Sequence, residues 1–391
     1  MPIAILFASS YTDLGGGETA LLNLVDTLDP ARYRPHLLAP RAGQLSAAWE
    51  ARGWPAHIIP YRGATVYFVP AIWARLPVTR RIERLIRDHD IRLVHSDYHT
   101  LPMALPAADR CGIPTLWTCW GWWFRPKPWQ RGFFRRCAAI LAQSRAILEG
   151  FLGDPPFMPP DQIEILYPGV DTTRFHPGVD GSALRAEIGL APAAPVVALI
   201  ARFQDVKGHD VFQAMARRVA AALPAAHFIV AGENTQTRAD DGYKRGILEA
   251  ARTDPLLRDR LAYLGFRADV ERVIAAADVV VCSSHFESFG MVNVEAMACG
   301  RPVVSTNRGG PAETVAHGET GLLVEPGDPD GLAAAVLELL RDPARRAQMG
   351  AAGRARVERL FAAQASGARF AQVIETALAA QLPGSAARTH K

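Results

Sequence analysis

Short apolar runs alternate with amphipathic segments along most of the chain, and the runs fall into two series. The first series comprises Ile3–Ala8, Arg34–Ala39, Ala56–Pro60, Ile91–His95, Pro114–Thr118 and Ala139–Ala142. The second series comprises Val196–Ala201, His227–Ala231, Leu261–Leu264, Val279–Cys282, Pro302–Ser305 and Gly321–Val324. Intervening segments such as Thr19–Leu28 and Val78–Arg87 have apolar residues at helical spacing. Uninterrupted apolar strands separated by helices predict parallel sheets covered on both faces, so we expect two doubly wound α/β domains.

A segment rich in proline and glycine, Tyr167–Gly178, separates the two series and has no period of its own. We therefore expect an N-terminal domain over residues 1–177 and a C-terminal domain over residues 178–362. The last of three predicted C-terminal helices, over about residues 363–382, could pack back on the first domain, and residues 383–391 read as a disordered tail. Ligands of such sheets bind at the carboxyl ends of the strands, and two facing domains would offer a cleft between those edges.

Composition narrows the class of protein. Of the 391 residues, 49% are hydrophobic and 21% are charged, as in packed soluble proteins. The net charge of +4 is not gathered in one block, so no nucleic-acid partner is expected. No apolar run reaches the length of a membrane span, and Met1–Phe7 has no basic region in front of it, so it reads as a strand rather than a signal peptide. Five scattered cysteines without a CxxC spacing fit a reducing cytoplasm.

A glycine-rich loop, Gly15-Gly16-Gly17-Glu18, follows the first strand and leads into a helix. Such a loop lets the backbone approach an anionic ligand at the helix N-terminus. Its spacing also matches a loose dinucleotide fingerprint, although the second strand ends without the acid that binds the ribose of NAD. Arg41 could take a 2′-phosphate, so an NADP-binding oxidoreductase stays open, as does a simple tight turn.

Two segments of the second half carry candidate phosphate ligands. Arg202 and Lys207 flank one strand-to-helix loop, where two cations suit a diphosphate, although solvated loop charges are the plain alternative. After strand Val279–Cys282, Glu287 lies in the loop, Gly290 begins a helix whose free amides can cradle a phosphate, and Glu295 follows in that helix. Two carboxylates with seven residues between them can accept hydrogen bonds from hydroxyls of one ligand. A later glycine-rich loop, residues 307–313, reaches the same edge.

These segments resemble the retaining GT-B glycosyltransferases of family 4. Glu287–Glu295 is similar to the family's E-x7-E motif. The likeness extends over almost the whole chain, through the Gly-Gly-x-Glu loop, Pro168-Gly169-Val170-Asp171-x-x-x-Phe175, Arg202…Lys207-Gly208, Leu264-Gly265-Phe266, and Glu295-Ala296-Met297-Ala298-x-Gly300-x-Pro302-Val303-Val304. The resemblance implies the GT-B fold, a nucleoside diphosphate sugar as donor, and retention of the anomeric configuration without a bound metal or other cofactor.

The resemblance also implies roles for individual residues. Arg202 and Lys207 would hold the donor diphosphate and Glu287 would contact the transferred sugar, which makes these three the catalytic candidates. The other donor contacts would come from the loop at Gly16 and Gly17, the base-facing Phe266 and Val270, the amides of Gly290, Met291 and Val292, and Glu295 on the ribose.

The acceptor side is less well specified. Glu18 belongs to the Gly-Gly-x-Glu loop, and Trp120 stands where family members usually carry a histidine. His99, after the preceding strand, could reach the cleft, although a lone loop histidine is more often ordinary polar surface. The substitution at Trp120 leaves open a catalytically weak nucleotide-sugar-binding protein of the same fold.

Two further segments bear on metal and membrane binding. Asp88-His89-Asp90 reads as a DxD motif, but it precedes a strand and lies at the amino edge of the sheet, so we expect no metal there. Residues Trp122–Arg136 hold six aromatics and five cations without an acid. They predict peripheral contact with an anionic membrane, a sugar-stacking wall, or ordinary core with solvated arginines.

The sequence thus predicts a cytoplasmic glycosyltransferase, and Trp122–Arg136 leaves the inner face of the membrane open as its place of action. It would move a sugar from a UDP- or GDP-linked donor to a glycan or lipid-linked acceptor, in cell-surface polysaccharide or glycolipid synthesis.

Overall fold

The computed structural model describes residues 2–61, 76–121, 126–234 and 242–380, and it divides into two compact units. The first unit comprises Met1–Gly169 together with Ala363–Lys391, and the second comprises Val170–Ala362. The boundary predicted after residue 177 lies further along the chain than this division. The predicted tail, residues 383–391, and the end of the last predicted helix lie outside the described residues.

The first unit contains a seven-stranded parallel sheet with the strand order β3-β2-β1-β4-β5-β6-β7. Its strands are β1 (Ile3–Ala8), β2 (Tyr33–Ala39), β3 (Ala56–Ile58), β4 (Ile91–Ser96), β5 (Thr115–Cys119), β6 (Ala139–Ala142) and β7 (Ile163–Ile165). Its helices are α1 (Gly16–Asp26), α2 (Gln44–Glu50), α4 (Pro77–Asp88), α5 (Leu101–Arg110), α6 (Pro128–Phe134), α7 (Arg145–Leu152), η1 (Pro160–Gln162) and α16 (Ala363–Ala379).

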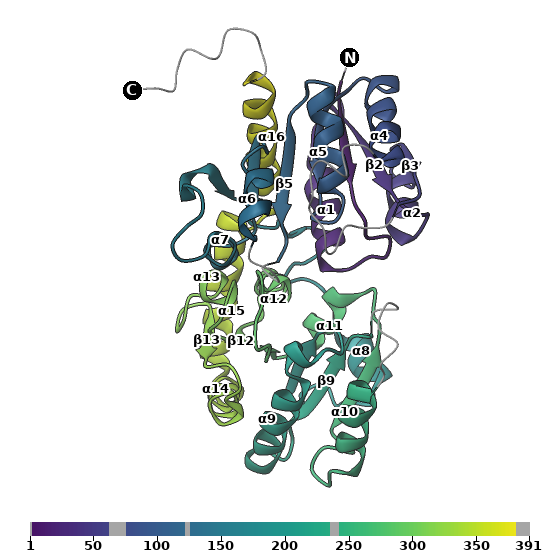
Figure 1. Ribbon diagram of the computed structural model, residues 1–391. Coiled ribbons are helices and arrows are strands. Elements are labelled where there is room, and N and C mark those ends of the chain that lie inside the picture. Colours follow the sequence, from purple (N-terminus) through teal and green to yellow (C-terminus); the bar gives the residue numbers. More distant parts are fainter. Residues whose placement is uncertain (1, 62–75, 122–125, 235–241, 381–391) are drawn as a thin grey trace. The chain divides into compact units, whose positions relative to one another are not determined.

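Strand β1 is apolar throughout because both of its faces are covered. Ile5 and Phe7 belong to a core cluster with residues of α1 and α16, whereas Leu6 and its neighbours on the other face pack with residues of α4 and α5. Figure 1 shows α16 (yellow) beside the strands of this unit, far in sequence from the rest of it. Helices α16 and α1 approach so closely that a Cβ on Gly367 would lie 1.9 Å from Oγ1 of Thr27. The C-terminal helix is therefore an integral part of the first unit's core.

The second unit contains a six-stranded parallel sheet with the order β10-β9-β8-β11-β12-β13. Its strands are β8 (Val196–Ile200), β9 (His227–Ala231), β10 (Leu261–Gly265), β11 (Val279–Cys282), β12 (Val303–Thr306) and β13 (Gly321–Val324). Its helices are α8 (Ser182–Glu187), η2 (Asp205–Lys207), α9 (His209–Ala222), α10 (Gly242–Thr253), α11 (Val270–Ala276), α12 (Met291–Ala298), α13 (Pro311–Thr314), α14 (Pro329–Arg341) and α15 (Pro343–Leu360).

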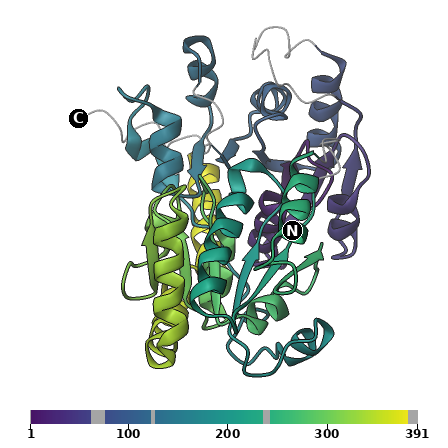
Figure 2. The ribbon, with the colours of Figure 1, turned by 90° about the horizontal axis from the view of Figure 1, so that it is seen from below.

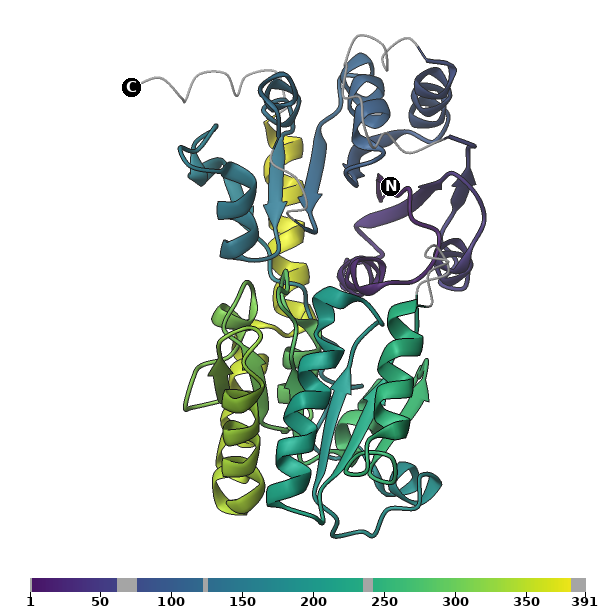
Figure 3. The same ribbon diagram turned by 60° about the horizontal axis from the view of Figure 1, so that its bottom comes forward.

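Helices α14 and α9 lie side by side over one face of this second sheet, as Figures 2 and 3 show. Their apolar faces meet the valines of β8 and β11 in one buried core. Within the described residues, no helix is long and apolar enough to cross a membrane.

Each sheet reverses its strand order beside its first strand, between β1 and β4 in the first unit and between β8 and β11 in the second. In doubly wound sheets this reversal makes the loops at the carboxyl ends diverge, and ligands bind in the crevice that results. The ligand site of each unit is therefore expected at the carboxyl ends of the two strands that flank the reversal, β1 and β4 in the first unit and β8 and β11 in the second.

All strands predicted from the apolar runs are present, within one or two residues at their ends. The two doubly wound domains predicted from them are confirmed. Strand β7 was not predicted, because Ile163-Glu164-Ile165 is short, has a charged centre and follows a proline-rich stretch. Its position beside β6 is set by tertiary pairing rather than by a local pattern.

Candidate active site

An ion pair crosses the strand reversal of the second unit. Nζ of Lys207, from the loop after β8, donates to Oε1 of Glu287, from the loop after β11, at 2.6 Å. The two side chains are 18% and 17% exposed, so the pair is shielded but still reachable from solvent. The Ser284 hydroxyl also donates to Oε1 of Glu287, at 2.7 Å. Residues 80 positions apart in the chain thus form one charged and hydrogen-bonded cluster.

The loop that carries Lys207 is fixed by the neighbouring loop. It turns through η2 into a left-handed Gly208 (φ +63°), where a Cβ would lie 2.2 Å from the Ser283 carbonyl oxygen. The Ser283 hydroxyl donates to the Gly208 carbonyl at 2.9 Å, and the amide of His285 donates to the Val206 carbonyl at 2.8 Å. Only glycine permits this close approach of the two loops, which sets where the ammonium group of Lys207 lies.

The loop that carries Glu287 is held from its other side by the glycines after β12. The amide of Gly310 donates to the Glu287 carbonyl at 2.9 Å, and Glu287 forms an isolated bridge with Gly309. Thr306 anchors the same loop, because its hydroxyl donates to the Ser284 carbonyl at 2.6 Å. The glycine-rich loop of residues 307–313 therefore reaches the Glu287 edge, where it supports the Glu287 backbone.

Helix α12 begins directly after the loop that carries Glu287, with Gly290 in a left-handed conformation as its N-cap. The first amides of a helix have no partner within it and carry partial positive charge, so the region of Gly290, Met291 and Val292 suits an anion. Glu295 lies half-buried one turn further on. Burial raises its pKa to about 7, with Glu271 acting in the same direction and Arg174 against it.

The remaining donor-side candidates lie at the same carboxyl edge. Arg202 lies two residues after the end of β8 and is exposed. Within the described residues its guanidinium has no ion-pair partner. Phe266 follows β10 and is 75% exposed, which leaves a large apolar ring in solvent. Val270 begins α11 and is half-buried. An exposed aromatic ring at this edge is a surface on which a planar base can stack.

The predicted residues of the first unit lie at its own carboxyl edge. Gly16 and Gly17 form the first turn of α1, and a Cβ on either would meet open space. Glu18 lies at the third position of the helix, where its carboxylate accepts a hydrogen bond from the Gly15 amide at 3.0 Å. This contact gives Glu18 a capping role in addition to the acceptor-side role predicted from the sequence.

His99 and Trp120 follow β4 and β5. His99 packs against the rings of Tyr11 and Tyr98, and its Nδ1 is buried without a hydrogen-bond partner in the described structure. Trp120 packs partly on the core shared with α1 and α16, and its carbonyl accepts from Nε2 of Gln143. Both therefore have packing contacts, and their predicted acceptor contacts stay predictions.

Sequence reasoning missed two polar residues that organise these edges. The buried carboxylate of Asp97 accepts from the amide and hydroxyl of Ser10, both at 2.6 Å, and so joins the loops after β1 and β4. Ser284 performs a similar task for Glu287. Their position within two residues of a strand's carboxyl end is the signal that could have indicated them.

The aromatic and basic segment of residues 122–136 divides between core and surface. Phe133 and Phe134 on α6 are buried, whereas Trp129 is 59% exposed beneath the ammonium of Lys127. Residues 122–125 lie outside the described residues. Part of the segment is thus ordinary core, and its contact with a membrane or a sugar stays a prediction.

Comparison with known families matches both units. Residues 14–174 match the model of Glycosyltransferase Family 4, and residues 181–356 match that of Glycosyl transferases group 1. A D-inositol 3-phosphate glycosyltransferase of Segniliparus rotundus is 37% identical over 195 residues, which cover 50% of this chain and 42% of the relative. A GDP-mannose-dependent monoacylated α-(1-6)-phosphatidylinositol monomannoside mannosyltransferase of Corynebacterium glutamicum is 36% identical over 222 residues, 54% of this chain and 56% of the relative.

The chain thus spans about half the length of these curated relatives. Among solved structures, Anabaena HepE in complex with UDP aligns with a TM-score of 0.80 at 23% identity, covering 96% of this chain and 100% of that one. A Rickettsia africae glycosyltransferase aligns with a TM-score of 0.83 at 17% identity, covering 96% and 99%. These likenesses confirm the predicted GT-B fold. Since the two family models together match most of both units, the chain belongs to the group 1 glycosyltransferases of family 4.

Proposed function

We propose that this protein transfers a sugar from a nucleoside diphosphate sugar to a glycan or lipid-linked acceptor with retention of configuration, and that the reaction needs no metal or other cofactor. The observation that carries the proposal is the Lys207–Glu287 pair at the strand reversal, next to the N-terminus of α12. Cation, carboxylate and helix amides together match the two halves of such a donor, a diphosphate and a hydroxyl-bearing sugar. The activities for which the relatives are named support a donor of this class.

The chemistry required of the chain is mainly charge stabilisation and positioning. The ammonium of Lys207, with the exposed guanidinium of Arg202, would neutralise the diphosphate as it departs. The Glu287 carboxylate already accepts hydrogen bonds from Lys207 and Ser284, which suits a fixed acceptor for sugar hydroxyls better than a mobile acid or base. In a front-face displacement, an oxygen of the leaving phosphate takes the acceptor proton while the acceptor oxygen bonds to the anomeric carbon.

The donor base and the acceptor are open within this proposal. UDP appears in the complex of the Anabaena neighbour and GDP-mannose in the name of the Corynebacterium relative, so both bases are candidates. The names of the relatives also contain inositol phosphate and phosphatidylinositol, which support testing a phosphoinositol or lipid-linked acceptor first. Transfer to a lipid-linked acceptor at the inner face of the membrane would fit the cytoplasmic location predicted from the sequence.

The deciding experiment is a thermal-shift panel of UDP- and GDP-sugars with NADP as comparison, followed by product analysis with the best donor. We expect one nucleoside diphosphate sugar to raise the unfolding temperature, and NMR of the product to show the donor's anomeric configuration retained in EDTA. Stabilisation by NADP alone would favour the oxidoreductase suggested by Gly15–Gly17 and Arg41. Donor binding without transfer or hydrolysis would favour a catalytically weak binding protein.

The raised pKa of Glu295 predicts a pH dependence of donor binding. With a pKa of about 7, the side chain is a carboxylate above that pH and a neutral acid below it. A carboxylate accepts hydrogen bonds from ribose hydroxyls more strongly than a neutral carboxyl group does. We therefore expect the Kd of a nucleotide sugar, whose diphosphate does not titrate in this range, to rise about tenfold as the pH falls from 8 to 6. In Glu295→Gln this dependence should disappear, and an unchanged pH profile in that variant would assign it to another group.

A further inference from the structure

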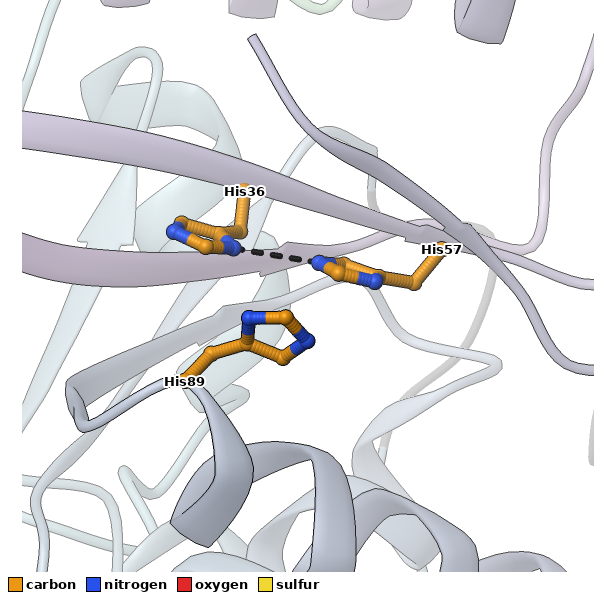
Figure 4. A group of neighbouring side chains, drawn as sticks. All are labelled: His36, His57 and His89. Carbon is orange, nitrogen blue, oxygen red and sulfur yellow. Dashed lines mark hydrogen bonds between the residues drawn. The ribbon is translucent and has the colours of Figure 1, made fainter.

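Three histidines from separate elements form a cluster in the first unit. His36 lies within β2, His57 within the edge strand β3, and His89 at the end of α4 (Figure 4). One ring nitrogen from each lies within 4.8 Å of those of the other two. Nδ1 of His36 and Nε2 of His57 are 3.1 Å apart, and the rings of His57 and His89 have centroids 4.5 Å apart.

Packing alone gives little reason for histidine at these positions. His36 is fully buried, and its Nε2 has no hydrogen-bond partner in the described structure, so an aliphatic side chain would fill the strand position at lower cost. Imidazole nitrogens are strong ligands for zinc-type divalent metals.

We propose that His36, His57 and His89 bind a divalent zinc-type cation, with water in the fourth position. A tetrahedral zinc ion at about 2.0–2.1 Å from each nitrogen places its ligand atoms roughly 3.3 Å apart, close to the separation of the His36 and His57 nitrogens. His89, at an exposed helix end, can complete the set with a small adjustment of its ring. The ion would replace the single hydrogen bond between His36 and His57 with three coordination bonds.

The surrounding charge narrows the class of metal. The described cluster offers three nitrogens and no oxygen ligand, and the guanidinium of Arg34 acts on His36 from the same strand. Binding must therefore rest on strong imidazole coordination rather than on negative charge. Zn²⁺, Cu²⁺ and Ni²⁺ meet this requirement, whereas Mg²⁺ and Ca²⁺ depend on oxygen ligands.

The place of the cluster indicates a structural role. β3 is a three-residue edge strand paired only with β2 among the described strands, and the chain runs from it through residues 59–76 to α4. A metal held by these three residues would join β2 and β3 to the C-terminal end of α4, the helix that follows this connection. The proposed site departs from the sequence expectation that no metal binds at Asp88-His89-Asp90, and its ligand from that segment would be His89.

The test uses the full chain without an affinity tag, stripped with a chelator and titrated with ZnCl₂ or MgCl₂. Zinc at about a hundredfold excess over its Kd is expected to raise the unfolding temperature by about 5–10 °C, and magnesium should have no effect. His89→Ala removes a ligand at an exposed position, so the chain should still fold, and calorimetry should then show zinc binding at least about tenfold weaker.

His317→Ala is the matched control, because His317 is also exposed but lies in the second unit, where its Nδ1 accepts from the Leu323 amide. This variant should bind zinc as the unaltered chain does. The proposal is overturned if zinc gives no stabilisation, or if His89→Ala and the unaltered chain respond to it equally.

Discussion

Replacing Lys207 with alanine is expected to lower kcat/KM for sugar transfer by about 10³-fold while the chain remains folded. The ammonium group lies at the strand reversal of the second unit, shielded from solvent and bonded to Glu287 at 2.6 Å. A cation in such a setting acts on a departing diphosphate with little screening by water. The ammonium group should stabilise the transition state, in which negative charge grows on the departing diphosphate, more than it stabilises the bound donor. Its removal should therefore lower kcat more than it raises KM.

Loss of one partner of a shielded ion pair also destabilises a protein, by about 3–5 kcal/mol where burial is deep, so stability must be measured separately. Arg185→Ala provides the comparison. Arg185 pairs with Asp278 at similar exposures, 14% and 22%, and donates to the carbonyls of Ala276 and Pro192 rather than to a group of the candidate site.

This control variant should lose thermal stability but keep its kcat/KM in an assay at low temperature. Near-normal turnover in Lys207→Ala, measured beside this control, would contradict the proposed role of the ion pair.

The sheets could be predicted from the sequence because their strands are covered on both faces. Strand β8, Val196–Ile200, has no polar residue; its neighbour β11 shows the same apolar pattern, and so does its other neighbour β9 after the first residue, His227. The rule that ligands of doubly wound sheets bind at the carboxyl ends of the strands directed attention to Arg202, Lys207 and Glu287. That β8 and β11 flank the strand reversal is shown by the structure and was not predicted. The strands could be predicted because an uninterrupted apolar run in the sequence indicates a strand buried on both faces of a sheet.

Contacts between distant loops could not be predicted in the same way. The bond from Ser284 to Glu287 is local in sequence, but the support of Glu287 by Gly310 and the approach of Gly208 to Ser283 depend on how two strand ends meet. The histidine cluster is a stronger example, since His36, His57 and His89 share no motif or spacing. Such sites arise from the pairing of strands and the packing of a helix, which a single sequence does not encode locally.

Gly309→Ala is expected to weaken donor binding at least about tenfold, although Gly309 need not touch the donor. Its φ of +78° is disfavoured for alanine, and a Cβ would lie 2.1 Å from the Glu287 carbonyl oxygen and 2.8 Å from the ring of Phe286. The backbone oxygen cannot move aside without carrying its residue along, so the Glu287 carboxylate should leave Lys207 and Ser284. A shift of about 1 Å in a positioning group is enough to cost about 10²-fold in rate.

Gly318→Ala separates this effect from backbone strain. Gly318 has nearly the same conformation, with φ +79°, but a Cβ there would meet open space. Both variants should lose about 1 kcal/mol of stability through the left-handed conformation, and only Gly309→Ala should lose further stability and donor affinity. Donor titration by calorimetry distinguishes the cases, and equal affinities in the two variants would mean that Glu287 is not held in place by Gly309. Gly309 is needed because a side chain there would collide with the Glu287 backbone. The loss of donor affinity in Gly309→Ala, compared with Gly318→Ala, would therefore measure how accurately the Glu287 loop must be positioned.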